Sequence, residues 1–405
     1  MDIANIPLSL YVHFPWCVRK CPYCDFNSHE IPEGLDETAY IDAVLRDLEV
    51  DLPLLSGRRP GSVFFGGGTP SLISGPSLKR LLEGIRDTVG LEPGAEITVE
   101  ANPGTVDSGH FAAYREAGVN RLSIGVQSFD DGMLSALGRI HSAADAVAAY
   151  RSAREAGFDQ INLDLMFGLP GQDAAGVAAD IRQALELGPA HLSWYQLTIE
   201  PHTAFAHAPP PRIPDDDALW AMHEAGGALL AAAGYRHYEV SAWAQEGSQC
   251  RHNRNYWEFG DYIGVGAGAH GKLTLGDRRI ERRRRERHPE AFMRGAVAGN
   301  ALSGTTRLQD EDLVLEFMMN ALRLETGVPS GLLEARTGLK LEAVKPRIAL
   351  AVEQGLLEPD PETYVPPIWA GGTSTGCSTI SSECTGQKRK VCAYFFLKLG
   401  VVPSG

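Results

Sequence analysis

The chain lacks a long apolar run, and basic residues are fewer than acidic ones. No segment offers about 18 uninterrupted apolar residues, and the N-terminal stretch MDIANIPLSLYVHF has no basic region ahead of an apolar one, so neither a membrane span nor a secretory leader is predicted. The formal net charge is −14. A general nucleic-acid binder needs a basic face, so the net charge argues against this class. Seven cysteines in 405 residues do not predict a disulfide framework. We therefore expect an acidic cytoplasmic protein with one large core and a smaller second one.

Six β-rich runs alternate with amphipathic helical stretches between residues 8 and 200. The runs are LSLYVHF, SVFFGGG, EITVEA, RLSIGVQ, QINLDLMFG and HLSWYQLTI. Strands separated by helices predict βαβ units and a parallel α/β sheet, here a partial (β/α)6 barrel of the TIM type. In such barrels the chemistry lies at the carboxyl ends of the strands. The cysteines follow the first run and GGGTP the second, which places both at that rim.

Four segments are expected along the chain. The barrel core covers residues 1–235 and an extension covers 236–300. Residues 301–365 form a small, mainly helical C-terminal domain of the winged-helix type, with a β wing near GLLEPDPETYV. The remaining 366–405 form an atypical tail.

Three cysteines, Cys17, Cys21 and Cys24, lie within eight residues, and no fourth is near. Structural zinc sites usually have four ligands, so one interpretation is a zinc site completed by His13 or His29. A [4Fe–4S] cluster held by three thiolates would instead leave one iron open to an exogenous ligand. The spacing C-x-x-x-C-x-x-C favours the cluster.

This cysteine motif directly after a first strand, with a glycine-rich loop after the second, resembles the radical S-adenosylmethionine superfamily. The resemblance implies that the open iron binds the amino and carboxylate groups of S-adenosylmethionine. The motifs YVHFPWC, GGGTP, TVEANP, GVQSF, INLDLMFGLPGQ and HNRNYWEFGDYIGVGAGAHG occur in this order over roughly residues 7 to 365. Together they resemble the oxygen-independent coproporphyrinogen oxidase family.

The same resemblance assigns a set of cofactor-binding residues. Those expected around the first S-adenosylmethionine are Tyr11, Gly67, Gly68, Thr69 and Glu100, and Tyr23 is a further expected cofactor-binding residue. Those that match the lining of a second cofactor molecule in the oxidases are Gln127, Arg139 and Asp164. Glycines would let the backbone approach a ligand closely, and a carboxylate could hold ribose hydroxyls. Taken singly, each is also an ordinary polar residue at a strand end.

One position separates two branches of the family. The oxidases carry another cysteine two residues after the third, and this chain has Phe26 there. With CPYCDFNSH and CRHNRNYW, this resembles the heme chaperone branch called HemW. The resemblance implies heme binding, transfer to recipient respiratory heme proteins, a heme donor protein as a further partner, and no catalytic residue. Radical oxidation of coproporphyrinogen III remains the alternative because the second-cofactor residues are retained. A zinc-stabilised binding protein is the third interpretation.

His252 is the expected heme ligand. Neutral imidazole is a common axial ligand of heme iron, and the neighbouring Tyr256 and Trp257 could cover an apolar macrocycle. The resemblance implicates the H-N-x-x-Y-W motif in heme binding. The alternative is a histidine hydrogen-bonded inside a packed aromatic turn. Cys250 is either a thiolate ligand or a small buried residue. The arginine run from Arg278 to Arg287 could meet heme propionates, although a solvated face is the favoured interpretation.

The chain changes character near Pro366. Family members normally end with an amphipathic helix. The codons for Pro-Ile-Trp-Ala-Gly-Gly, read one base out of step, can encode Thr-Asp-Leu-Gly-Arg-Arg, a sequence typical of that helix. A frameshift is therefore our hypothesis, under which Cys377, Cys384 and Cys392 have no function. The alternative, a C-terminal metal site, has irregular spacing and no histidine partner.

Overall fold

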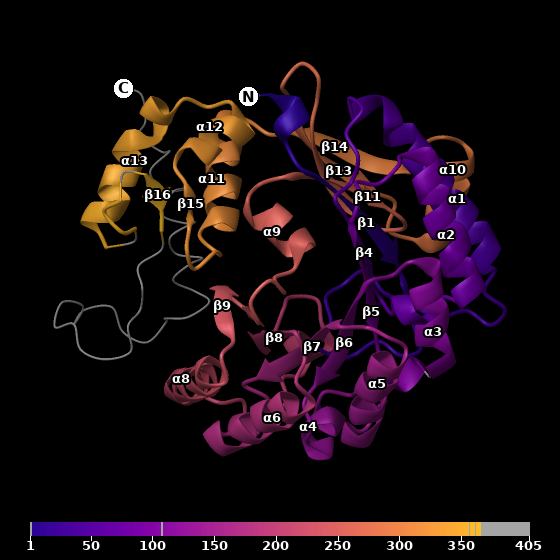
Figure 1. The fold of residues 1–405 in the computed structure, drawn as a ribbon, viewed down its shortest axis with the longest axis vertical. Coiled ribbons are helices and arrows are strands. Elements are labelled where there is room, and N and C mark those ends of the chain that lie inside the picture. Colours follow the sequence, from indigo (N-terminus) through magenta and orange to yellow (C-terminus); the bar gives the residue numbers. More distant parts are fainter. Residues whose placement is uncertain (1, 107, 356, 361, 366–405) are drawn as a thin grey trace.

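The computed structural model describes residues 2–106, 108–355, 357–360 and 362–365 (Figure 1). The predictions for the tail at 366–405, including the frameshift, the three tail cysteines and the metal-site alternative, lie outside the described residues.

A 12-stranded sheet organises the chain, in the order β14-β13-β12-β11-β1-β4-β5-β6-β7-β8-β10-β9. The strands from β11 to β8 in this order run parallel. Six of these seven are the predicted strands, and the partial barrel is confirmed. They are β1 (Leu8–Phe14), β4 (Ser62–Gly67), β5 (Glu96–Ala101), β6 (Arg121–Gln127), β7 (Gln160–Phe167) and β8 (His191–Gln196). Antiparallel strands continue the sheet at both edges.

Helices between the strands cover the outer face of the barrel (Figure 1). They are α1 (Glu37–Asp51), α2 (Gly75–Thr88), α3 (Ser108–Ala117), α4 (Asp131–Ala136), α5 (Ala143–Glu155), α6 (Ala174–Leu187), α7 (Ala204–His207) and α8 (Asp216–Ala232). Local sequence sets their ends. The Ser142 side chain and Asp145 form a capping box at the start of α5, and Gly188 ends α6 in the left-handed conformation.

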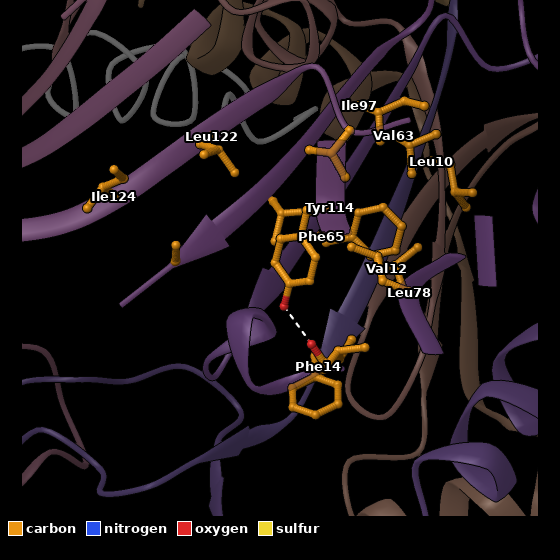
Figure 2. Close-up of a cluster of buried hydrophobic side chains, with 14 of the residues drawn as sticks. Leu10, Val12, Phe14, Val63, Phe65, Leu78, Ile97, Tyr114, Leu122 and Ile124 are labelled. Atoms are coloured by element: carbon orange, nitrogen blue, oxygen red, sulfur yellow. Dashed lines mark hydrogen bonds between the residues drawn. The ribbon is translucent and has the colours of Figure 1, made fainter. Parts of the chain in front are cut away.

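The barrel core lies between these helices and the strands. Figure 2 shows Phe65 of β4, Leu78 of α2 and Tyr114 of α3 packed together with β1 side chains. Six of the seven residues of β1 are buried. Both faces of a parallel strand are covered by protein, so its sequence is a nearly continuous apolar run and not an alternating one.

The extension adds strands on both edges of the barrel. It contains β9 (Arg236–Glu239), β10 (Ala242–Ala244), α9 (Arg251–Trp257), β11 (Asp261–Val265), β12 (His270–Thr274), β13 (Ile280–Arg285) and α10 (Pro289–Val297). Strand β14 (Leu302–Arg307), just beyond the predicted boundary at residue 300, pairs with β13 at the edge of the same sheet. Helix α9, which carries the H-N-x-x-Y-W motif, contacts β1, β4, β11 and α11 (Figure 1).

The favoured interpretation of the arginine run as a solvated face is wrong for two of its members. Arg285 is 1% exposed and donates to Asp47 and Asp51 at 2.8 and 2.6 Å, while Arg283 donates to Asp51 at 2.9 Å. Both arginines lie on strand β13, where alternate side chains point to opposite faces of the sheet. One of these faces packs on helix α1, which supplies the two carboxylates.

The C-terminal part is mainly helical, as predicted. It consists of α11 (Asp310–Ala321), α12 (Gly331–Thr337) and α13 (Leu341–Glu353), with a small sheet of β15 (Val328–Pro329) and β16 (Thr363–Tyr364) at the expected wing. Its core includes Phe259 and Tyr238 of the extension, so the two segments pack together. The four segment boundaries stay predictions. None of the described helices is long and apolar enough to cross a membrane.

Candidate functional site

The cysteine loop leaves the carboxyl end of β1 and is held at both ends by a parallel pair of short strands, β2 (Trp16–Cys17) and β3 (His29–Glu30). Cys17 is buried, Cys21 and Cys24 are partly exposed, and all three are free thiols. Burial raises the pKa of the Cys24 thiol, and the charges of the other two cysteines raise it further. The three thiols therefore lie close enough to influence one another.

Of the two histidines considered as additional zinc ligands, His13 is engaged elsewhere, whereas the buried Nε2 of His29 has no hydrogen-bond partner among the described residues. The His13 ring accepts a hydrogen bond from the Tyr11 hydroxyl at 2.7 Å and donates to the backbone oxygen of Asn27 at 2.9 Å. The His29 ring packs edge-on against His288. In the part of the chain that the structure describes, no three cysteine, histidine or acidic side chains converge as a site for one metal ion. This finding covers Cys17, Cys21 and Cys24 as well, so the zinc interpretation and the cluster interpretation both stay predictions.

The GGGTP loop packs directly on the cysteine loop. Gly67 has φ +120°, and a Cβ there would lie 2.7 Å from the His13 ring. A Cβ on Gly68 would lie 2.5 Å from the backbone oxygen of Trp16, which also accepts a hydrogen bond from the Thr69 N–H at 2.8 Å. The sequence argument explained these glycines by close approach of a ligand. The structure adds a second reason, the close approach of the protein's own chain.

Two half-buried carboxyls, Glu100 of β5 and Asp164 of β7, come from alternate strands of the barrel. Burial and the charge of Asp164 raise the pKa of Glu100 to about 8. The hydrogen bond that Glu100 accepts from the Gly67 N–H acts in the opposite direction. Burial also raises the pKa of Asp164, which accepts hydrogen bonds from Ser123 Oγ at 2.9 Å and Asn162 Nδ2 at 2.7 Å. These are groups suited to bind hydroxyl or amino groups of a ligand.

Arg139, one of the residues expected to line a second cofactor molecule, lies beside the cysteine loop. Its Nη1 lies 3.6 Å from the Cys21 sulfur and its Nη2 donates to a backbone oxygen of β6. Gln127 lies at an irregularity of β6 with φ +69°, and its side chain accepts a hydrogen bond from the Tyr195 hydroxyl at 2.8 Å. Tyr23 hydrogen-bonds Arg139. The sequence analysis missed Tyr195, although its place near the end of the sixth strand could have identified it.

A cavity of about 980 Å³ adjoins this rim. Tyr11, Gly67 and Glu100 form part of its wall, and so do Asp25 to Asn27, which directly follow Cys24. Helix α9 contributes Tyr256 and Trp257. The rest of the wall comes from His13 of β1, Phe64 of β4, the residues that link α9 to β11, strands β11 to β14 with their loops, and α11. The sequence analysis did not predict this cavity, because it depends on strands from the extension lying beside β1.

His252 is not among the residues that line this cavity, and it packs against Glu96 and Phe64. It is 5% exposed, its Nδ1 lies 2.8 Å from a Glu96 carboxylate oxygen, and its ring stacks on Phe64 with centroids 4.3 Å apart. Burial alone would raise the pKa of Glu96, but His252 and Arg121 together lower it to about 2. Glu96 begins strand β5, so this pair lies at the amino end of that strand. The assignment of His252 as a heme ligand stays a prediction. Cys250 is fully buried, and burial raises its pKa to about 12, which fits the small-residue interpretation.

Comparison with known proteins places these features in a family. Residues 11–184 match the model of the Radical SAM superfamily, and residues 308–366 match the HemN C-terminal domain. The heme chaperone HemW of Escherichia coli K12 is 51% identical over 87% of this chain and 92% of its own length. That of Haemophilus influenzae is 48% identical over 88% and 93%. The mouse protein named radical S-adenosyl methionine domain-containing protein 1, mitochondrial, is 38% identical over 81% and 75%.

Among solved structures, coproporphyrinogen III oxidase from Escherichia coli matches 98% of this chain and 91% of its own, with a TM-score of 0.78 and 22% identity. At that identity the likeness establishes the fold. The curated relatives establish more, because identity of about half extends over nearly their whole length. The chain therefore belongs to the HemW family within the radical SAM superfamily.

Proposed function

We propose that this protein is a heme chaperone that binds heme and transfers it to recipient heme proteins. The observation that carries the proposal is the 51% identity to a heme chaperone over 92% of that protein's length. We further propose that the chain holds a [4Fe–4S] cluster on Cys17, Cys21 and Cys24 and binds S-adenosylmethionine at the rim beside it. Respiratory heme proteins are the proposed recipients, and a heme donor protein is a further proposed partner.

The residues of the cysteine loop fit such a cluster. Three free thiols lie close together on a loop whose ends are fixed by the β2–β3 pair. The Arg139 guanidinium at 3.6 Å from the Cys21 sulfur provides positive charge beside what would be an anionic thiolate. Three protein ligands leave one iron free for the cofactor. When bound, the cluster supplies an electron that can cleave the sulfonium of S-adenosylmethionine.

The polar rim fits the cofactor. Glu100 and Asp164 provide half-buried carboxyls that can accept hydrogen bonds from ribose hydroxyls or an amino group. The positions of Gly67 and Thr69 are fixed by packing on the cysteine loop, so the backbone around them is preorganised. Gln127 and Arg139 lie across the rim and extend the polar surface.

Phe26 favours the chaperone over the oxidase. It replaces the additional cysteine of the oxidase branch, is 58% exposed and lines the cavity. An exposed aromatic ring at a cavity wall offers an apolar surface to a porphyrin and no ligand to a metal. We also propose a cytoplasmic location, because the four cysteines in the described ranges are free thiols, as in reducing compartments.

Anaerobic reconstitution followed by two assays tests the proposal. The reconstituted chain is titrated with heme and then mixed with an apo heme protein, while a parallel sample receives coproporphyrinogen III, S-adenosylmethionine and a reductant. We expect saturable heme binding, transfer to the acceptor and no protoporphyrinogen. Formation of protoporphyrinogen would support the oxidase instead.

A matched pair of variants controls the cluster assignment. Cys21→Ser should lose the iron and sulfide, whereas Cys250→Ser should keep both, because Cys250 is buried away from the loop. Wild-type iron content in Cys21→Ser would refute the assignment.

A further inference from the structure

The cavity beside the cysteine loop is lined by aromatic, cationic and acidic side chains. We propose that heme binds in this cavity with His270 as its iron ligand and with Arg284 and Arg287 as the partners of its two carboxylates. This inference rests on the proposed chaperone function and assigns its binding site.

The cavity has the size and the surface that a porphyrin needs. Sites for cofactors of this size are commonly about 300–1,000 Å³ and mainly apolar, and this cavity is about 980 Å³. Six aromatic rings line it besides Tyr11, namely Phe26, Phe64, Tyr256, Trp257, Phe259 and Tyr262. The H-N-x-x-Y-W helix therefore contributes its two aromatic residues to the cavity wall, while its histidine is bonded to Glu96.

His270 begins β12 and lines the cavity. Its side chain makes no hydrogen bond, ion pair or ring contact with any residue that the structure describes. Burial lowers the pKa of His270, and the charges of Arg284, Arg282 and Arg287 lower it further. A neutral imidazole with an unoccupied nitrogen is what a heme iron requires of an axial ligand. The Nδ1 of His252, in contrast, is occupied by a buried carboxylate.

The cations of the wall divide into paired and unpaired ones. Lys272 donates to Asp261 at 2.9 Å, and Arg282 donates to Glu316 at 2.9 Å. Arg284 and Arg287 have no acidic partner among the described residues, and the guanidinium of Arg287 makes one long hydrogen bond to Asn27 at 3.4 Å. Two unpaired guanidinium groups match the two propionates of heme, because such pairs form strong charge-assisted hydrogen bonds. A tetracarboxylate would leave two of its carboxylates without a cation.

The charges also orient the ligand. The acidic residues of the wall, Asp25 and Glu100, lie beside the cysteine loop and the glycine loop, whereas Arg284 and Arg287 belong to the extension. Arg287 also hydrogen-bonds Asn27, three residues after Cys24, so the propionates would be held where the extension meets the end of the cysteine loop, and the ring would lie over the aromatic wall.

Three ligands separate the roles of iron and carboxylates in binding to the reconstituted full-length protein. They are heme, protoporphyrin IX without iron, and heme dimethyl ester without carboxylates. We expect His270→Ala to weaken heme binding about tenfold and to remove the absorption signature of a histidine-ligated iron, while protoporphyrin IX binds as to wild type. We expect Arg284→Gln and Arg287→Gln each to weaken heme and protoporphyrin IX about tenfold, but not the dimethyl ester. Arg278→Gln, which alters an exposed residue of the same run outside the cavity wall, should change none of the affinities.

The outcomes distinguish this inference from the function on which it rests. Wild-type protein that binds no heme would refute the proposed function itself. Heme binding that is normal in His270→Ala but lost in His252→Ala would overturn the site assignment and leave the chaperone function intact. Tighter binding of coproporphyrin III, with four carboxylates, than of protoporphyrin IX, which also lacks iron, would overturn the pairing with two propionates. Because His270 is exposed, its substitution should leave folding and cluster content unchanged, and circular dichroism and iron analysis check this.

Discussion

Replacing His252 by alanine tests what the histidine of the H-N-x-x-Y-W motif does in the absence of heme. Its partner Glu96 is 8% exposed, and the Nδ1 of His252 lies 2.8 Å from the carboxylate. Removing one partner of a buried ion pair usually costs about 3–5 kcal/mol. Arg121 at 3.6 Å and the backbone N–H of Arg251 at 3.0 Å remain to compensate the charge. We therefore expect His252→Ala to lower the free energy of unfolding by about 2–3 kcal/mol at neutral pH.

Urea unfolding of wild type and variant, followed by tryptophan fluorescence at several pH values, measures this loss. The pKa of Glu96 is lowered to about 2 from an ordinary value of 4.5. A carboxyl whose pKa is lower in the folded state stabilises the protein above its unfolded pKa, and this stabilisation is lost as the pH falls through the folded pKa. The cost of His252→Ala should therefore be full at pH 7 and should shrink below about pH 4.5.

A double-mutant cycle assigns the loss to the ion pair. In the background of Glu96→Gln the carboxylate charge that His252 faces is removed, so His252→Ala should cost clearly less than it does in wild type. Equal losses of unfolding free energy in both backgrounds, or a loss below about 0.5 kcal/mol in the wild-type background, would refute the reasoning. His252 would then have ligand binding as its main role.

Three further predictions follow from buried or strained groups. The pKa of Glu100, raised to about 8 from 4.5, means that the folded state holds this proton more tightly, so the free energy of unfolding should fall by up to about 1.4 kcal/mol per pH unit between these values. Glu100→Gln should lack this slope, and parallel pH profiles of the two proteins in urea would contradict the assignment. Arg285→Met should cost about 3–5 kcal/mol because it leaves Asp47 and Asp51 without their main partner, whereas the exposed Arg284→Met should cost under about 0.5 kcal/mol by thermal unfolding. Gly67→Ala should lower the free energy of unfolding by about 1–3 kcal/mol because its Cβ would meet the His13 ring. Gly57→Ala, which also has a positive φ, +75°, but open space around it, is the control for backbone strain without the contact. Equal losses of stability in the two variants would show that the contact with His13 is unimportant.

The barrel could be predicted from the sequence because its signals are local. Each strand of the parallel sheet is a short apolar run followed by a polar residue or a glycine, and the helices between them have the period of amphipathic helices. The cysteines, Gly67, Glu100 and Asp164 follow from the rule that such strands present their carboxyl ends at one rim. The structure places all of these residues around that rim.

The extension could not be predicted in this way, because its partners are distant in sequence. Asp261 and Leu8 are partners in the pairing of β11 with β1, more than 250 positions apart. The run RRIERRRRERH has the composition of a solvated face, but its alternate residues include Arg283 and Arg285, which are buried by the carboxylates of α1. Charge composition alone does not show which partners the fold supplies.

The H-N-x-x-Y-W motif has one feature that the sequence predicts and one that depends on a distant partner. The sequence identified Tyr256 and Trp257 as aromatic neighbours that could cover a macrocycle, and both line the cavity. It could not show that His252 lies against Glu96, which begins a strand more than 150 residues earlier. His270, at the start of β12, could not be predicted as a ligand because this role depends on the cavity that the extension forms.

The most direct test of the account follows the heme itself. Cluster-bearing protein loaded with heme is mixed with an apo respiratory heme protein or with an unrelated apo heme protein, and the growth of the acceptor's Soret band is recorded. We predict stoichiometric transfer, faster to the respiratory acceptor than to the unrelated one. Equal rates to both acceptors, as expected for simple release into solution, would contradict the claim that the chain is a chaperone.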